Sequence, residues 1–282
     1  MTLLDVALRV VVAVAAAVAV AAVGLVGRKR LRVGHRTAWR NLRAVWPSAA
    51  FLAAVLAING VVRDIGIDLS WLLGVNVTGT IYALEGTLVA DLQSVATPAL
   101  TAYFGGIYVF GYTFVLAFPV VLYLLASDPR PLRVLLVAYV ANYGVGLCCY
   151  VLCVAYGPRN FMPELVAPLL YERWPQSQLL VSEVNTNTNV FPSLHTSLSA
   201  TVAILAYRYR RIAPLWLPTA TVLAASVAVA TMYLGIHWAT DVVAGVALAV
   251  VSVAAARRVA ANGDDRSTPA AAPTRRGRRR DG

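Results

Sequence analysis

Long runs of apolar residues recur along the chain, separated by shorter polar and basic stretches. Each run approaches the roughly twenty residues that a helix needs to cross the hydrocarbon core of a bilayer. Because that core offers the backbone no hydrogen-bond partners, such runs must form helices. The pattern predicts an all-α integral membrane protein, a helical bundle of about seven transmembrane helices. The predicted spans are Leu4–Val26, Ala44–Val62, Thr101–Ala126, Val134–Tyr156, Leu194–Tyr207, Ala213–Leu234 and Trp238–Ala256.

Composition favours the same class. Apolar residues make up 59% of the chain and charged residues only 13%, whereas a soluble domain carries roughly a quarter charged residues. The net charge of +11 could indicate nucleic-acid binding. The basic residues, however, fall in short clusters between apolar runs, which is how membrane topology is encoded. We therefore expect the bilayer, and no nucleic acid, as the partner of the positive charge.

The basic clusters predict the orientation of the chain in the membrane. They follow the first, third, fifth and seventh spans, and the intervening loops carry few basic residues. The clustered residues are Arg28, Lys29, Arg30, Arg32, Arg36, Arg40, Arg43, Arg130, Arg133, Arg208, Arg210, Arg211, Arg257 and Arg258. The positive-inside rule places this side in the cytoplasm of a multi-pass cell-membrane protein. The N-terminus is then outside, the C-terminus is cytoplasmic, and the first span is expected to be retained rather than cleaved as a leader.

Candidate chemistry is concentrated in two of the three histidines. His35 lies in a cytoplasmic basic loop, where solvent exposure is expected. His195 and His237 each fall at the predicted outer end of a helix, and Asp241 follows His237 by one helical turn on the same face. Ionisable side chains at membrane depth are costly, which makes these three residues candidates for function.

Such a group can perform phosphoryl transfer. A neutral imidazole can attack phosphorus and form a phosphohistidine, and a carboxylate bound to its second nitrogen fixes the tautomer. A second, protonated histidine can supply a proton to the leaving oxygen. The phosphoryl oxygens also need positive groups. Arg159 is one candidate, and the start of the helix at Ser193 is another, because helix N-termini attract anions.

Two sequence motifs around these residues resemble those of the type-2 phosphatidic acid phosphatase superfamily. Phe191–Ser197 is similar to its Pro-Ser-x-His signature, and Tyr233–Asp241 is similar to its His-x3-Asp signature. The segment Tyr156–Arg159 resembles a degenerate form of its first signature. The resemblance implies that His237 is the nucleophile, His195 the leaving-group acid and Asp241 the orienting carboxylate. It further implies that Arg159 and Ser193 bind phosphate and that no metal cofactor is needed.

Two positions depart from the family pattern. Leu152 stands where the first signature has a lysine, and Thr231 stands where the third has an arginine. The pattern is most similar to the inositol phosphorylceramide synthase-like branch, which contains phosphotransferases as well as hydrolases. Arg173 is a further candidate for a missing positive charge.

The resemblance implies three regions and a substrate class. Residues 1–100 would form an N-terminal transmembrane hairpin with a basic cytoplasmic loop and an outer interfacial segment, residues 101–256 a phosphatase-like catalytic membrane domain, and residues 257–282 a disordered basic cytoplasmic tail. A site at headgroup depth suits a lipid phosphate or an isoprenyl diphosphate, with transfer to water or to an alcohol on the extracytoplasmic side. The alternatives are a transporter or binder of anionic lipid headgroups, and a structural relative without activity.

Overall fold

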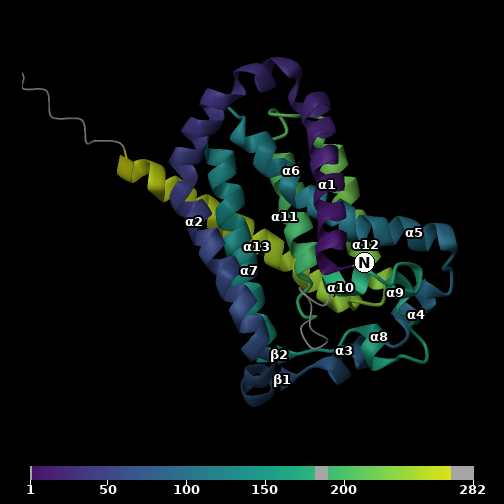
Figure 1. Cartoon of the computed structure of the whole chain (residues 1–282). Helices are drawn as coiled ribbons and strands as arrows, with labels where there is room; N and C mark the ends of the chain where they lie inside the picture. Colours follow the sequence, from purple (N-terminus) through teal and green to yellow (C-terminus); the bar gives the residue numbers. More distant parts are fainter. Residues whose placement is uncertain (1, 182–189, 268–282) are drawn as a thin grey trace, which may run out of the picture.

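A computed structural model of the chain describes residues 2–181 and 190–267 (Figure 1). Most of the apolar runs are helical, and only a two-residue parallel pairing of β1 with β2 interrupts the all-helical pattern. The polar stretch at 185–189 and the last 15 residues of the basic tail lie outside the described residues. The predicted fold class, an all-α integral membrane protein, is confirmed.

Within the described residues, six helical segments are long and apolar enough to cross a bilayer. They comprise α1 with the π-helix η1 (Leu3–Ala21 and Ala22–Val26), part of α2 (Arg28–Leu73), α5 with η2 and α6 (Pro98–Gly106, Ile107–Gly111 and Tyr112–Leu124), α7 (Arg130–Leu152), α12 (Trp216–Tyr233) and α13 (Ala239–Ser267). The fifth predicted span, Leu194–Tyr207, is also a helix, α11 (Leu194–Arg208), but its 15 residues are fewer than a full crossing requires.

The short helix α11 lies at the centre of the bundle. It packs against α6, α7, α12 and α13, so its residues meet protein rather than lipid. This explains its many small polar residues. Ser197, Ser199 and Thr201 are all fully buried, and the side-chain amide of Asn142 on α7 donates to the Thr201 hydroxyl at 3.1 Å. Ser197 in turn donates to the Asn142 amide oxygen. These hydrogen bonds satisfy the hydroxyl groups of Ser197 and Thr201, which lipid could not, whereas the Ser199 hydroxyl has no partner among the described residues.

The faces of the outer helices are apolar and exposed. Val12 on α1, Phe51 on α2 and Val251 on α13 are each about 60% exposed. A soluble protein rarely leaves such long apolar faces uncovered, whereas hydrocarbon chains cover them in a bilayer. The outward-facing side chains therefore support a multi-pass membrane protein independently of helix length.

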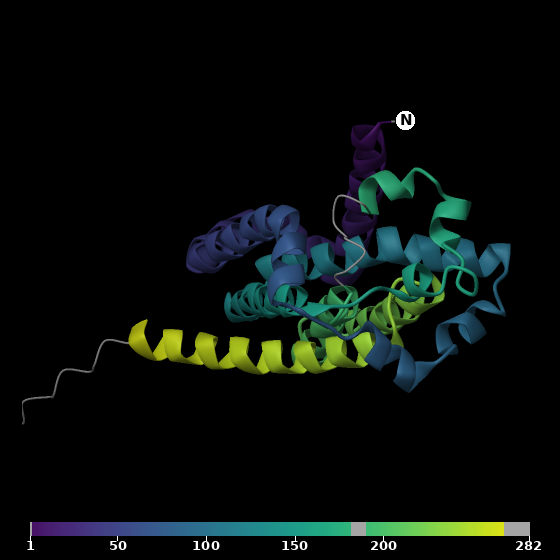
Figure 2. The ribbon, with the colours of Figure 1, turned by 90° about the horizontal axis from the view of Figure 1, so that it is seen from below.

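Successive helices connect two opposite ends of the bundle. One end holds β1 (Val75–Asn76), β2 (Cys153–Val154) and the short helices α3 (Thr78–Glu85), α4 (Leu88–Gln93), α8 (Pro158–Phe161), α9 (Leu169–Arg173) and α10 (Ser177–Val181) (Figure 1). Both α11 and α13 begin at this end. Figure 2 shows α13 running along one side of the molecule from α3 to the far end.

Helix boundaries differ from the expected ones at both ends of the bundle. α2 continues without a break to Leu73, past the expected end at Val62, and the short helices α3 and α4 follow it. α7 stops at Leu152 because Cys153 and Val154 pair with β1. α13 continues to Ser267, beyond the expected Ala256. A tight turn separates the last two spans, with Gly235 at φ 69°, a conformation that favours glycine.

Candidate active site

The starts of α11 and α13 are joined directly by their backbones. The Ser193 N–H donates to the Asp241 carbonyl at 3.0 Å, and the Ser193 side chain caps α11 by accepting from the Thr196 N–H at 3.3 Å. Gly245, one turn along α13, permits this approach: a Cβ there would lie 2.6 Å from the Ser193 carbonyl oxygen. The two sequence motifs, 42 positions apart at their histidines, are thereby brought to one place.

His237 lies in the turn before α13, almost completely buried. Its Nδ1 is 3.3 Å from Asp241 Oδ2, and the same carboxylate oxygen accepts the Trp238 N–H at 2.9 Å. Asp241 is fully buried, and its Oδ1 has no hydrogen-bond partner among the described residues. The carboxylate thus orients the imidazole so that Nδ1 carries the proton and Nε2 has a free lone pair.

His195, in the first turn of α11, faces His237. The two ring centroids are 5.9 Å apart, close enough for both imidazoles to contact one phosphate group. Tyr108 and Tyr112 hold the His195 ring on its other sides, with centroid distances of 4.7 and 4.5 Å. No hydrogen bond joins the His195 ring to another described residue, so its nitrogens are available to a substrate.

Arg159 lies beside the turn that carries His237. Its backbone N–H donates to the Gly235 carbonyl at 3.0 Å. Tyr171 holds the guanidinium, which lies 4.7 Å from the ring centroid and donates from Nη2 to the hydroxyl at 3.0 Å. Nη1 is buried without a hydrogen-bond partner in the described part of the chain. A buried guanidinium nitrogen left open in this way suits an anion.

Glu85 is a site residue that the sequence did not point to. From the end of α3, its carboxylate accepts the Ala239 N–H at 2.8 Å and also the Thr240 N–H. These are free donors of the first turn of α13, where the helix dipole favours a negative charge. Glu85 and Asp241 are far apart in sequence, so no local pattern joins them. Gln93 also links segments that are distant in sequence. Its side-chain NH2 donates to the Ala167 and Tyr233 carbonyls, and its amide oxygen accepts the Ala167 N–H.

The two residues that depart from the motif pattern, Leu152 and Thr231, carry no charge. Leu152 is 55% exposed at the end of α7, and Thr231 is fully buried with its hydroxyl donating to the Ala228 carbonyl at 2.8 Å. Arg173 is exposed at the end of α9. Arg159, whose backbone N–H bonds the Gly235 carbonyl, is a positive residue that the structure places beside the His237 turn. Across residues 2–181 and 190–267, no group of three or more His, Cys, Asp or Glu side chains gathers as metal ligands would.

Comparison with known proteins identifies one family. A family model described as "PAP2 superfamily" matches residues 80–255. The match spans the two histidine motifs, Arg159 and Glu85. No curated protein and no solved structure matches the chain.

Substituting Gly245 tests the contact between α11 and α13. Gly245→Ala adds a methyl group against the Ser193 carbonyl, so the helices must separate, and we expect a loss of about 1–3 kcal/mol in the free energy of unfolding. Gly144→Ala is the matched control, because a Cβ at this helical glycine meets nothing within 4 Å; it should be neutral or stabilising. Thermal unfolding in detergent measures both. Equal stability of the two variants would contradict the close approach.

Proposed function

Because the chain belongs to the PAP2 superfamily, we propose that it is a membrane lipid-phosphate phosphatase or phosphotransferase acting through a phosphohistidine intermediate. Membership in the family supports a phosphatase-type function. The observation that carries the finer proposal is the position of His237, which lies between the Asp241 carboxylate and the His195 imidazole. This is the arrangement that a nucleophile, its orienting group and an acid require.

In the first step, His237 Nε2 attacks the phosphorus of the substrate. The new N–P bond forms as the bond between phosphorus and the leaving oxygen breaks, and His195 gives its proton to that oxygen. The carboxylate of Asp241 stabilises the positive charge that develops on His237. In the second step, His195 takes a proton from water or from an alcohol acceptor, whose oxygen attacks phosphorus and breaks the N–P bond. Free phosphate or a new phosphoester leaves, and both histidines return to their starting states.

Two groups are suited to hold the phosphoryl oxygens during this reaction. The open Nη1 of Arg159 can donate to one of them. The backbone N–H groups in the first turn of α11, after Ser193, can donate to another. The Ser193 hydroxyl itself is engaged with Thr196, so we propose that Ser193 acts by fixing the helix start rather than by a direct side-chain bond.

We propose an amphiphilic phosphate, either a lipid phosphate or an isoprenyl diphosphate, as the substrate. The site lies at one end of a bundle whose outer helices are apolar, where lipid headgroups would be found. The uncharged Leu152 and Thr231 leave fewer fixed positive charges than the full family motifs supply, which favours the inositol phosphorylceramide synthase-like branch and transfer to an alcohol. By the positive-inside rule, this end faces the extracytoplasmic side.

Replacement of the histidines tests the proposed reaction. His237→Ala is expected to lower phosphate release by about 10³-fold or more, because no nucleophile remains, and His195→Ala by about 10²–10⁴-fold through loss of the acid. The assay uses purified protein in detergent with EDTA, and offers phosphatidic acid, an isoprenyl diphosphate and an inositol phospholipid, each with and without an alcohol acceptor.

His35→Ala is the control, because this exposed histidine lies on α2 far from the site. It should retain wild-type release. The proposal fails if folded His237→Ala protein turns over every substrate as fast as the wild type. Headgroup binding without turnover in the wild type would instead favour the non-catalytic binder or transporter.

Glu85 is expected to be a positioning residue for the same reaction. Glu85→Gln keeps one acceptor oxygen but removes the charge that caps α13, so the Asp241–His237 pair shifts. We expect kcat to fall by about ten- to a hundredfold with little change in KM. Glu164→Gln, an exposed substitution at the same end, should leave kcat unchanged. An unaltered kcat together with a lower unfolding temperature would mean that Glu85 is merely structural.

Cysteine labelling tests the proposed orientation. In a chain with Cys148, Cys149 and Cys153 replaced by serine, a membrane-impermeant maleimide should label Glu172→Cys in intact cells, because this exposed residue lies at the site end. Arg258→Cys at the opposite end should react only after permeabilisation. The reverse pattern would place the site in the cytoplasm.

A further inference from the structure

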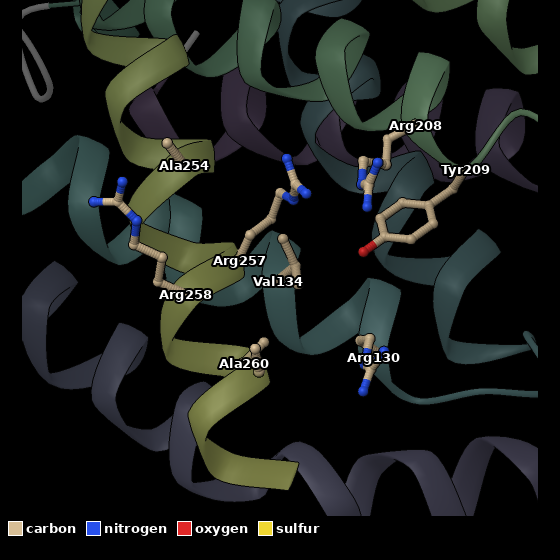
Figure 3. Close-up of a pocket in the computed structure, with 9 residues that line it drawn as sticks. Arg130, Val134, Arg208, Tyr209, Ala254, Arg257, Arg258 and Ala260 are labelled. Atoms are coloured by element: carbon tan, nitrogen blue, oxygen red, sulfur yellow. The ribbon is translucent and has the colours of Figure 1, made fainter. Parts of the chain in front are cut away.

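A positively charged hollow lies at the end of the bundle opposite the histidines (Figure 3). Its volume is about 420 Å³. Three helices form the hollow. They contribute the first residues of α7, the end of α11 and the C-terminal half of α13. The residues that line it are Arg130, Val134, Arg208, Tyr209, Ala254, Arg257, Arg258, Ala260 and Ala261.

The guanidinium groups are not arranged evenly around α13. Figure 3 shows Arg208 and Arg257 on the same side, close to the Tyr209 hydroxyl, whereas Arg258 extends to the other side of the helix. Burial raises the pKa of the Tyr209 hydroxyl, against the opposing effect of Arg208, Arg130 and Arg257. Tyr209 is therefore a neutral hydrogen-bond donor with three guanidinium charges nearby.

Asp128 is an acidic residue near this hollow: its charge acts on Tyr209, and its Oδ1 accepts the backbone N–H of Arg130 at 2.9 Å. No salt bridge joins Arg208 or Arg257 to an acidic side chain within the described part of the chain. Like charges gathered around one hollow repel each other, and a bound anion relieves that repulsion.

Membrane topology alone does not account for this cluster. The positive-inside rule needs basic residues on one side of the bilayer but does not need them to converge from three helices. Arg210 illustrates the difference. It lies two residues after Arg208, yet its guanidinium packs 4.9 Å from the Tyr207 ring centroid and donates to the Tyr207 carbonyl at 3.1 Å. Arg208 and Arg257 instead face a shared space.

We propose that this hollow is a second anion site that binds a phosphate group through Arg208 and Arg257, with Tyr209 as a donor. The planar guanidinium fork matches phosphate oxygens in geometry as well as charge. Both a lipid headgroup and a free phosphate or diphosphate carry this chemistry. The apolar wall formed by Val134, Ala254 and Ala260 suits the hydrocarbon of a lipid's acyl chains.

The site is separate from the candidate active site but built on the same helices. Thirteen residues of α11 separate His195 from Arg208, about 20 Å along the helix. α13 likewise carries Asp241 at one end and Arg257 at the other. A phosphate held between the far ends of α11 and α13 would therefore fasten these helices together, and we expect it to raise the unfolding temperature.

Ligand-dependent thermal unfolding tests the site without relying on activity. The full chain carries Arg159→Gln, so that phosphate bound at the histidine end contributes least. One arm titrates pyrophosphate into protein in neutral detergent at constant ionic strength. The other compares nanodiscs of phosphatidylcholine with and without phosphatidic acid. In at least one arm the unfolding temperature should rise with the amount of phosphate probe.

Matched variants decide whether the rise comes from this hollow. Arg208→Gln combined with Arg257→Gln should weaken the apparent affinity by about tenfold or more, because charge-assisted hydrogen bonds are lost. Arg210→Gln removes the same kind of charge outside the hollow and should change nothing. Arg257→Lys, which keeps the charge but loses the fork, gives an intermediate affinity and serves if the double variant fails to fold.

The two arms identify the source of the phosphate. Arginine-dependent binding of pyrophosphate indicates a site for free phosphates, and a response only to phosphatidic acid indicates a lipid headgroup. The proposal is overturned if neither probe raises the unfolding temperature or if the double variant binds as tightly as its parent. It is also overturned if Arg210→Gln weakens binding equally, since that would mean diffuse surface charge. None of these outcomes bears on the histidine reaction.

Discussion

Asp241 joins the elements of the candidate active site, and the rest of the site depends on it. Its carbonyl accepts the Ser193 N–H and so fixes the start of α11, while its carboxylate orients His237 and accepts the Trp238 N–H. One buried residue thus sets the position of the His237 imidazole relative to His195. Because these groups are buried, the two helix starts cannot separate without leaving the Ser193 N–H and the Asp241 carbonyl without that hydrogen bond.

Close packing and a supporting layer maintain this arrangement. Gly245 lets α13 approach the Ser193 backbone, and Gly157 lets the chain before Arg159 lie against the Ile236 carbonyl. Beyond these contacts, Glu85 caps α13 and Gln93 bonds the end of α12. The short helices α3 and α4 therefore support the turn that carries His237.

The membrane environment explains why polar residues are concentrated where they are. The outer faces of α1, α2 and α13 are apolar, whereas α11, which is enclosed by other helices, carries buried hydroxyl groups bonded to Asn142. Positive charge is divided in the same way. Arg159 lies at the histidine end with one buried nitrogen open, and the arginines of α7, α11 and α13 converge at the other end. Charged side chains are confined to these two ends because burying charge within the membrane-spanning helices is costly.

The sequence by itself determined the fold class, the approximate spans and the two histidine motifs. These features are local: apolar run length, basic clusters and helical spacing are all read within a few turns of chain. Only the tertiary structure decided that α11 is enclosed rather than exposed to lipid, that α2 runs on to Leu73, and that Glu85 caps α13. It also decided that Arg208 and Arg257 share one hollow. Each of these depends on residues distant in the chain, whose meeting is set by helix packing and by the need to satisfy buried polar groups, and neither leaves a periodic signal in the sequence.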